Sequence, residues 1–498
     1  METLHIPSTF FPSTLITNAL IFSAILGFLS YARRPAQLSY PPGPKGYWLL
    51  GLVKVPLIKP WLTYVEWGKK YGDVIHFTRF GRHYVVINSL EAANEILERQ
   101  ARLTSDRPTR SKLDQIADFR RILATVPYGD RWRASRKIFH QNFRAEASVE
   151  YRPIEVKHVH RFLDGIADSS EMPLKDRIAI LSQIVMFDSV YGLEITTNKE
   201  GMSQHARDII DLNDLLFLPG WDAFKAIPFL DLLPSWFPGG HIRAAHEMVG
   251  ETFRAAAEGP WGQTMDAMKS DENHSSIMAK LVSENPENKS SEDIELIKNM
   301  GMQAVAAAAD TTMSAICTFF LAMSLYPDIQ LKAQQELDTV LGRGKTPTFD
   351  DRSSLPYIEA VYREVMRWHP ALPVGLPHGS IEDIYYKNYY IPKGTTISAN
   401  IWAMTHDESK FDKPDQFIPE RHLNKKNDIH SILAFGFGRR VCAGKYMADD
   451  MTWLTIASTL ATKNISSLPN KNVEDYFSNG GFCSTKSLDC KVTPRSEL

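Results

Sequence analysis

The residue that points most directly to chemistry is Cys442, in a short segment rich in glycine and arginine. From Phe435 to Gly444 this segment reads FGFGRRVCAG. A thiolate that binds iron beneath a flat macrocycle needs its backbone close to the ring, and glycines permit that approach. Backbone N–H groups of such a loop can also hydrogen-bond the sulfur and tune the iron. A single cysteine is more often a small buried hydrophobic residue, but this ordered pattern predicts a haem–thiolate ligand.

The side chains around the cysteine suit the same ligand. Arg440 supplies a fixed cation for an acidic side chain of haem, and Phe435 can shield the sulfur. Residues 446–458 read as a helix. The positive amino-terminal end of that helix would lie near the anionic sulfur.

An acid and a hydroxyl, Asp310 and Thr311, are adjacent in a long apolar segment. A charge in such surroundings is costly unless it has a partner or a task. One interpretation is that the acid bonds its own helical turn. The other is that the pair relays the two protons that cleavage of dioxygen requires, while a thiolate donates electron density from the opposite face. We predict the relay.

Two further pairs have spacings that place both side chains on one face of a helix. Glu364 and Arg367 are three residues apart, and Trp132 and Arg136 are four apart. Alone, the first pair is an ordinary ion pair worth less than about 1 kcal/mol. In the second pair both groups are donors, as two haem carboxylates would require. The alternative for that pair is a buried tryptophan beside a solvated arginine.

The segment around Cys442 resembles the haem-binding loop F-x-x-G-x-R-x-C-x-G of the cytochrome P450 family. All of its defining positions agree, namely Phe435, Gly438, Arg440, Cys442 and Gly444. The similarity extends along the chain and is greatest to fungal members of the endoplasmic reticulum. The resemblance implies a triangular, mainly α-helical body with a small β portion. Haem b (iron protoporphyrin IX) would lie between the Asp310 helix and the Cys442 loop.

The resemblance also assigns structural roles to charged residues. Glu364 and Arg367 match the family's E-x-x-R pair, which an arginine from a later loop joins. Arg421, in the segment FIPERH at 417–422, is expected to be that arginine. The resulting clamp would fix the loop beneath haem. His422 stands where the family usually has an aromatic residue.

Further resemblances concern the two faces of haem. Trp132, Arg136 and His378 are expected at the haem propionates, although an isolated histidine would otherwise be called structural. The family's A-G-x-D-T-T pattern has Ala308 here in place of glycine. The extra methyl would stiffen the helix and narrow the groove for dioxygen and water, with an effect on coupling.

Partners and substrate follow less directly. One basic set lies close to the predicted haem-binding segments in sequence: Arg131, Arg133, Lys137, Arg439 and Lys445. Such a set would normally be a solvated face. In the family, however, this face docks an acidic reductase that passes on electrons from NADPH. By position, the substrate pocket would be formed by residues 113–122, 303–307, 371–376 and 480–482. These are mostly apolar, which indicates a hydrophobic substrate or, equally, plain core packing.

The elements expected to position these residues are mostly helices. One should begin at Ser290 and run to about Leu325, and its all-round apolar character is typical of a buried core helix. Others should cover residues 327–342 and 356–368. Strands are expected within 73–88, with a turn at Gly81, and at 389–391 and 396–399. The sequence therefore predicts a mainly α protein with a minor β part.

The first forty residues differ from the rest. Residues 13–32 carry no charge, and twenty helical residues span about 30 Å, the thickness of a bilayer core. Arg33 and Arg34 follow and mark the cytoplasmic side; a cleaved signal is the alternative. We expect a short lumenal segment (1–12), a transmembrane anchor (13–32), a basic, proline-rich hinge (33–46) and a cytosolic haem-binding catalytic domain (47–498), in the endoplasmic reticulum membrane.

Composition sets outer limits on function. The chain has 498 residues, a formal charge of −2 and four cysteines without a C-x-x-C pair. Nothing in this favours nucleic acid as a partner, and a disulfide framework is not expected. The expected reaction inserts one oxygen atom from dioxygen into a C–H or double bond of a small molecule in fungal secondary metabolism. Two rivals are a haem–thiolate isomerase or dehydratase that needs no reductase, and a non-catalytic haem- or lipid-binding membrane protein.

Overall fold

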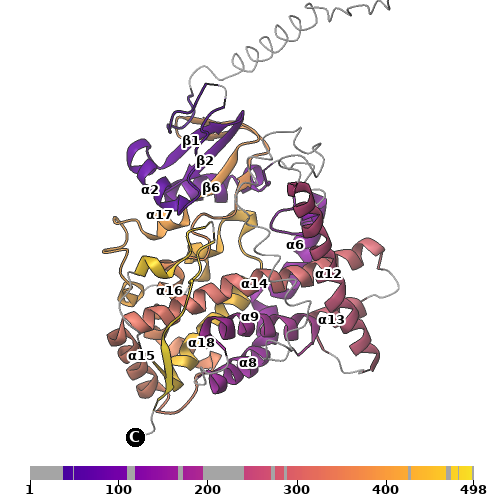
Figure 1. The fold of residues 1–498 in the computed structure, drawn as a ribbon, viewed down its shortest axis with the longest axis vertical. Helices are drawn as coiled ribbons and strands as arrows, with labels where there is room; N and C mark the ends of the chain where they lie inside the picture. The colour runs from indigo at the N-terminus through magenta and orange to yellow at the C-terminus, as the bar shows by residue number, and fades with distance from the viewer. Residues whose placement is uncertain are drawn as a thin grey trace, which may run out of the picture.

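The computed structural model describes residues 38–495, apart from residue 49, residue 481 and the segments 109–117, 167–171, 195–240, 271–274, 285–288, 424–427 and 467–472. The predicted anchor at 13–32 lies outside the described residues. The described chain is mainly helical with small sheets, as predicted. In Figure 1 the helices form the broad lower part of the body, and strands β1 and β2 lie in its narrower upper part.

The helices surround one central element. The longer ones are α2 (Pro60–Tyr71), α6 (Asp130–Phe143), α8 (Arg152–Gly165), α9 (Leu174–Tyr191), α12 (His241–Ser270), α13 (Ile277–Ser283), α14 (Ser291–Leu325), α15 (Pro327–Val340), α16 (Pro356–Trp368) and α18 (Lys445–Thr462). Short helices are α3 (Leu90–Ala93), α4 (Ala101–Thr104), α7 (Ala145–Ser148) and α17 (Ile401–Thr405).

The central element is α14, which carries Asp310 and Thr311. Ser290 caps it by accepting the N–H of Asp293, while the Asp293 carboxylate accepts the N–H of Ser290. The helix packs against α6, α9, α12, α16 and α18. It is long and apolar enough to cross a membrane by length and composition, but 72% of its most apolar window is buried inside the body. It is therefore the core helix that the sequence predicted.

Other helices agree with prediction in place but differ in detail. The helix predicted for 356–368 has these bounds, and α15 ends at Val340, two residues before the expected end. The helix after the cysteine, α18, is longer than the predicted 446–458, because buried side chains continue along it to Ala461. The short helix α17 was not among the predicted helices. Asn400 caps it by accepting the N–H of Ala403.

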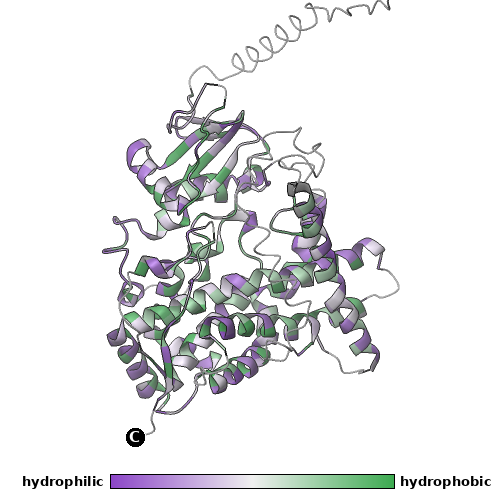
Figure 2. Cartoon of the chain, in the orientation of Figure 1, coloured by the Kyte–Doolittle hydropathy of each residue, from purple (hydrophilic) through white to green (hydrophobic). Residues whose placement is uncertain are grey.

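The main sheet has the strand order β1-β2-β6-β3. β1 (Val74–Arg79) and β2 (Arg82–Ile87) form the predicted antiparallel pair, and β6 (Thr396–Ala399) runs parallel to β2. β3 (His378–Gly379) pairs with β6 and so places His378 at the edge of this sheet. Two smaller pairs are β4 (Ile384–Tyr386) with β5 (Tyr389–Ile391) and β7 (Lys463–Ser466) with β8 (Lys491–Pro494). Figure 2 shows hydrophobic residues along β1 and β2 and hydrophilic ones along α15 at the edge of the body.

Candidate active site

A cavity of about 380 Å³ lies between α14 and the loop that precedes α18. Residues from several parts of the chain contribute to its apolar wall, including Ile122, Met186, Ala304, Leu372 and Phe482. Most of the predicted site residues line it, namely Trp132, Arg136, Asp310, Thr311, His378, Phe435, Arg440, Cys442 and Gly444. The fold thus brings residues that are more than 300 positions apart in sequence to one internal space.

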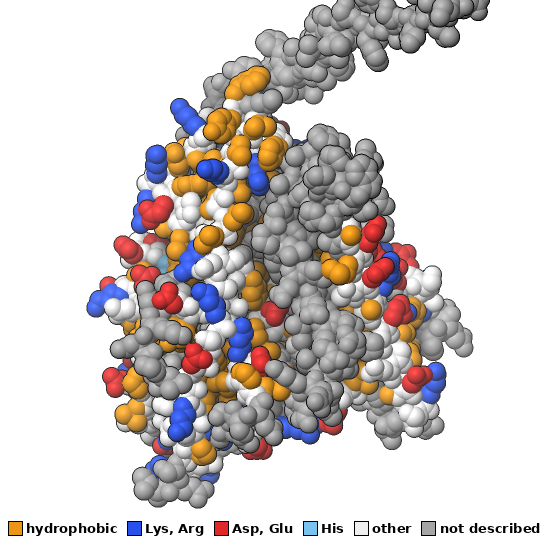
Figure 3. All heavy atoms as spheres, viewed as in Figure 1, with side chains coloured by type: hydrophobic (Ala, Val, Ile, Leu, Met, Phe, Trp, Pro, Cys, Tyr) orange, Lys and Arg blue, Asp and Glu red, His pale blue; other side chains and the backbone are white. Residues whose placement is uncertain are grey.

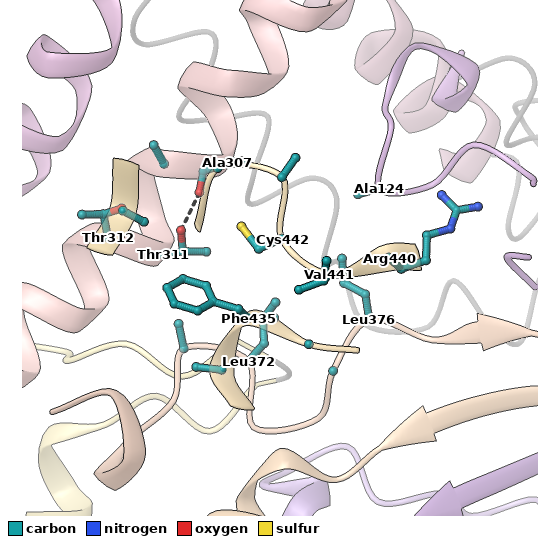
Figure 4. A pocket seen from close by; sticks show the side chains of 18 of the residues that line it. Ala124, Ala307, Thr311, Thr312, Leu372, Leu376, Phe435, Arg440, Val441 and Cys442 are labelled. Carbon is teal, nitrogen blue, oxygen red and sulfur yellow. Dashed lines mark hydrogen bonds between the residues drawn. The ribbon is translucent and has the colours of Figure 1, made fainter. Parts of the chain in front are cut away.

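The sulfur of Cys442 faces this space (Figure 4). The side chain is accessible from the cavity, but protein surrounds it closely, and burial raises the pKa of the thiol above its usual value. A hydrogen bond from the N–H of Gly444 and the charges of Arg136 and Lys445 act in the opposite direction. Gly444 is also the residue that precedes the first turn of α18, so the positive end of that helix lies beside the sulfur, as predicted.

The loop around Cys442 is held in a tight conformation. The N–H of Cys442 donates to the carbonyl of Phe435 over 2.8 Å. Gly438 has a φ of 58°, and a Cβ there would lie 2.3 Å from the carbonyl oxygen of Leu97. Only glycine fits that position without displacing the neighbouring backbone. Gly438 itself does not line the cavity, so its role is to shape the loop.

Arg440 is fixed by backbone carbonyls of residues that are distant from it in the sequence. Its guanidinium donates to the carbonyl oxygens of Ser105 (2.7 Å), Leu123 (2.9 Å) and Val126 (2.7 Å). It also lies over the ring of Trp132, 4.8 Å from the centroid. Arg440 is therefore a rigid cation at the edge of the cavity, as the sequence predicted.

Trp132 and Arg136 reach the cavity from α6, one turn apart. The indole N–H of Trp132 is buried and has no hydrogen-bond partner among the described residues. Arg136 makes no ion pair or hydrogen bond with them either, and burial lowers its pKa. A buried donor and a half-buried cation without partners are unfavourable alone. Both groups are therefore placed to bind carboxylates of a ligand in the cavity.

His378 also lines the cavity, but not in the protonation state that a hydrogen bond to a carboxylate requires. Its Nδ1 lies 2.9 Å from the carbonyl oxygen of Thr104, so Nδ1 carries the proton and donates it. Burial, helped by the nearby charge of Arg107, lowers the pKa of His378 to about 3. The neutral ring then presents Nε2 as an acceptor. To donate to a carboxylate, His378 has to take up a second proton.

Across the cavity, α14 presents Asp310 and Thr311. The hydroxyl of Thr311 donates to the carbonyl of Ala307 over 2.7 Å, and Figure 4 shows this bond facing the same space as the Cys442 sulfur. Because its proton is engaged, the Thr311 oxygen can accept a hydrogen bond from a group in the cavity. Ala308 also lines the cavity, and the helix remains regular through it.

The predicted charged clamp forms away from the cavity. The carboxylate of the fully buried Glu364 accepts hydrogen bonds from Arg367 (2.7 and 2.8 Å) and Arg421 (3.1 Å). It also accepts the N–H of Ile418 and one from His422 Nε2, each within 2.9 Å. Burial alone would raise the pKa of Glu364, but the bonds from Arg367 and His422 outweigh it and lower the pKa to about 2. His422, which replaces the family's aromatic residue, is thus a fourth member of the clamp.

Comparison with known proteins identifies the family. A family model described as cytochrome P450 matches residues 41–490. Cytochrome P450 monooxygenase 208 of Postia placenta is 34% identical over 97% of this chain and 96% of its own length. Cytochrome P450 monooxygenase claR of Ampulloclitocybe clavipes is 33% identical over 92% of this chain and 87% of its own length. Cytochrome P450 monooxygenase ple1 of Rhodocybe pseudopiperita is 33% identical over 96% of this chain and 94% of its own length.

The chain belongs to the cytochrome P450 family. It is a haem–thiolate monooxygenase, and the family implies haem iron as cofactor, a redox partner, dioxygen and a small-molecule substrate. The residues of this P450 fit haem: unpartnered donors, Trp132 and Arg136, face the cavity, and a Cβ at Gly444 would meet no protein atom within 4 Å. Haem iron, when bound, activates dioxygen and transfers one oxygen atom to the substrate.

Two features of this P450 were not predicted from the sequence. Arg107 lines the cavity and is held by the carbonyls of Ala124 (2.5 Å), Leu376 (3.1 Å) and Pro377 (2.5 Å). No spacing pattern marks it, because its partners are distant in sequence. The placement of Lys445 in a basic docking face was wrong, since its side chain is buried and bonds His430 Nδ1 over 3.0 Å.

The remaining basic residues are only partly available for docking. Arg133, Lys137 and Arg439 are exposed, whereas Arg131 is half-buried and pairs with Glu295 over 2.9 Å. Of the predicted substrate segments, Ile122, Gln303, Ala371 and Phe482 are among the residues that line the cavity, and residues 113–117 lie outside the described residues. Gln303 uses its amide to bond the backbone of residues 121 and 123, so it ties α14 to the segment that covers the cavity.

Proposed function

We propose that this P450 inserts one oxygen atom into a hydrophobic small molecule, by hydroxylation or epoxidation, with electrons from NADPH delivered by a separate cytochrome P450 reductase. The observation that carries the proposal is the apolar cavity with Cys442 on one side and Asp310 and Thr311 on the other. Cys442 would hold the iron, while Trp132, Arg136, His378 and Arg440 would orient haem through its carboxylates.

Asp310 and Thr311 are proposed to manage protons on the α14 side. Asp310 is half-buried and adjacent to Thr311, so a proton can pass from the acid towards the cavity. Thr311, whose own proton is held by Ala307, would stabilise a protonated oxygen by accepting its hydrogen bond. The apolar wall excludes water, which limits loss of protons and electrons to side reactions.

The proposed biological setting is fungal secondary metabolism, with a terpenoid, polyketide or aromatic alkaloid as substrate. Support comes from the fungal monooxygenases to which the chain is similar and from the apolar cavity wall. We also propose that residues 13–32 anchor the protein in the endoplasmic reticulum membrane and that the catalytic domain faces the cytosol.

The test is reconstitution of the full-length protein with haem, reductase and NADPH. A panel of fungal terpenoids, polyketides and alkaloids should yield at least one product heavier by one oxygen atom, detected by mass spectrometry. Turnover that persists without NADPH and reductase would instead support an isomerase or dehydratase. Spectral binding of panel members without any product would support a non-catalytic protein.

A further inference from the structure

Lys445 is a cation that the fold buries beside the Cys442 loop. Figure 3 shows Lys and Arg side chains scattered over one face of the molecule, where water solvates them. Lys445, in contrast, is only 5% exposed and lies in the first turn of α18, three residues after Cys442. Burying an ammonium is costly unless partners compensate for the lost water. The position adds to that cost, because the amino-terminal end of a helix is positive and favours anions.

The direct contacts of Lys445 do not neutralise this charge. Its Nζ lies 3.0 Å from Nδ1 of His430. An ammonium can only donate, so Nδ1 accepts and the imidazole is neutral, with its proton on Nε2. Nζ also lies over the ring of Tyr446, 5.0 Å from the centroid. No carboxylate of the described residues forms an ion pair with Lys445, so the compensating anion has to act over a longer distance.

The sulfur of Cys442 is the strongest such anion. Burial lowers the pKa of Lys445, and the charge of Cys442 is the largest effect that raises this pKa again. The influence is mutual, since the Lys445 charge counteracts the rise that burial causes in the pKa of the Cys442 thiol. Arg136 acts on the sulfur in the same direction, but it lines the cavity and is already proposed to bind a haem carboxylate. Lys445 does not line the cavity, so a haem carboxylate does not compete for its charge.

The ammonium of Lys445 is held by an acceptor that is itself fixed. The backbone N–H of His430 donates to Oδ1 of Asp428 over 2.9 Å. Arg363 of α16 ties down the same segment by donating to the hydroxyl oxygen of Ser431 (2.9 Å) and to the carbonyl oxygen of Asp428 (3.3 Å). His430 therefore presents Nδ1 from a rigid segment, and Lys445 cannot turn towards bulk water without losing that bond.

We propose that Lys445, held by His430, acts through Cys442 to favour the reduced state of the haem iron, and is thus a positioning residue for electron uptake. This inference rests on the proposed role of Cys442 as the iron ligand. Reduction adds one electron, which the redox partner supplies, and it neither makes nor breaks a bond. The added negative charge is shared between iron and sulfur, and a fixed cation nearby stabilises it.

The test is a spectroelectrochemical titration of full-length, haem-loaded protein without reductase or substrate. Lys445→Met removes the charge and keeps most of the side-chain volume. At a fixed applied potential the ratio of reduced to oxidised iron should fall about tenfold, which corresponds to a midpoint potential about 59 mV more negative. Lys445→Arg keeps a cation, and its ratio should stay close to that of wild type. An unchanged ratio in Lys445→Met, or an equal fall in both variants, would overturn the proposal.

Arg439→Met is the matched control for the loss of a positive charge. Arg439 lies three residues before the cysteine, and its side chain is exposed, so solvent and salt screen its charge. The ratio of reduced to oxidised iron in this variant should stay close to that of wild type. A fall as large as in Lys445→Met would mean that any cation near the loop has the same effect, which contradicts a specific role for Lys445.

A double variant tests whether His430 acts through Lys445. His430→Leu removes the acceptor and should lower the ratio in the same direction as Lys445→Met, but by less. In Lys445→Met/His430→Leu the second change should add nothing, because the charge that His430 holds is already gone. A further fall in the double variant would mean that His430 acts on the iron by itself, contrary to the proposal.

Electron paramagnetic resonance of each ferric variant separates this inference from the proposed function. A wild type without the signal of sulfur-ligated haem would overturn both. A signal that every variant retains, together with an unchanged ratio in Lys445→Met, would overturn only the role of Lys445. If Lys445→Met loses the signal, Lys445→Gln, which is neutral but polar, is titrated in its place against the same expectation.

Discussion

At the scale of single residues, Thr311 shows how a backbone bond determines what a side chain can do. Its hydroxyl proton is held by the carbonyl of Ala307, one turn earlier in α14. The side chain therefore offers lone pairs to the cavity. This favours a role as acceptor beside Asp310, with the acid as the source of protons.

Replacing Thr311 with alanine removes that acceptor and should leave haem bound. We expect the amount of product formed per NADPH to fall by roughly tenfold or more, because a positioned proton-transfer group contributes about 10²–10⁴-fold to the rate. The electrons that do not reach the product should be recovered as hydrogen peroxide. Thr311→Ser keeps the hydroxyl and is the control. Undiminished coupling in Thr311→Ala would refute the relay.

Trp132 and Arg136 should matter for haem retention because their N–H groups have no hydrogen-bond partner among the described residues. We expect Trp132→Phe and Arg136→Leu each to speed the transfer of haem to apomyoglobin several-fold, since each loses a bond of about 1–3 kcal/mol to a carboxylate. Arg133→Leu on the same helix is the matched control, because Arg133 is exposed and pairs only weakly with Asp130. Equal rates in the Arg136 and Arg133 variants would argue against propionate binding.

At the scale of elements, the clamp joins α16 to the loop at 417–422. Its carboxylate is ionised throughout the physiological range, because the pKa of Glu364 is lowered to about 2. A lowered carboxyl pKa stabilises the fold above the unfolded pKa, near 4.5, and this contribution is lost as the pH falls towards 2. The addition of His422 gives this carboxylate a partner that the sequence pattern alone did not reveal.

We expect Glu364→Gln to destabilise the protein by about 3–5 kcal/mol at pH 7, because buried Arg367 loses its counter-charge. His422→Phe removes one of several partners and should cost about 1 kcal/mol. Urea unfolding at pH 7 and pH 3 measures both. The Glu364→Gln deficit should shrink at pH 3, and a deficit that stays the same or grows would contradict the assigned ionisation.

At the scale of the whole molecule, the sequence predicted what local pattern determines. The bounds of α14 and α16, the β1–β2 pair and the place of Cys442 and Thr311 at the cavity followed from periodicity, caps, spacing or family resemblance. Contacts between distant segments were not predictable. Arg440 donates to carbonyls more than 300 positions away, Arg107 binds carbonyls on two other segments, and Lys445 is buried although its sequence neighbourhood is basic. These depend on tertiary packing, for which the linear pattern carries no signal.

The central claim is that the sulfur of Cys442 binds the haem iron. Electron paramagnetic resonance of the purified ferric holoprotein, compared with Cys442→Ala and Cys442→His, tests it most directly. Wild type should give the signal of sulfur-ligated low-spin haem, and both variants should lose it. A wild-type spectrum of nitrogen or water ligation, or a sulfur signal that persists in Cys442→Ala, would contradict this account.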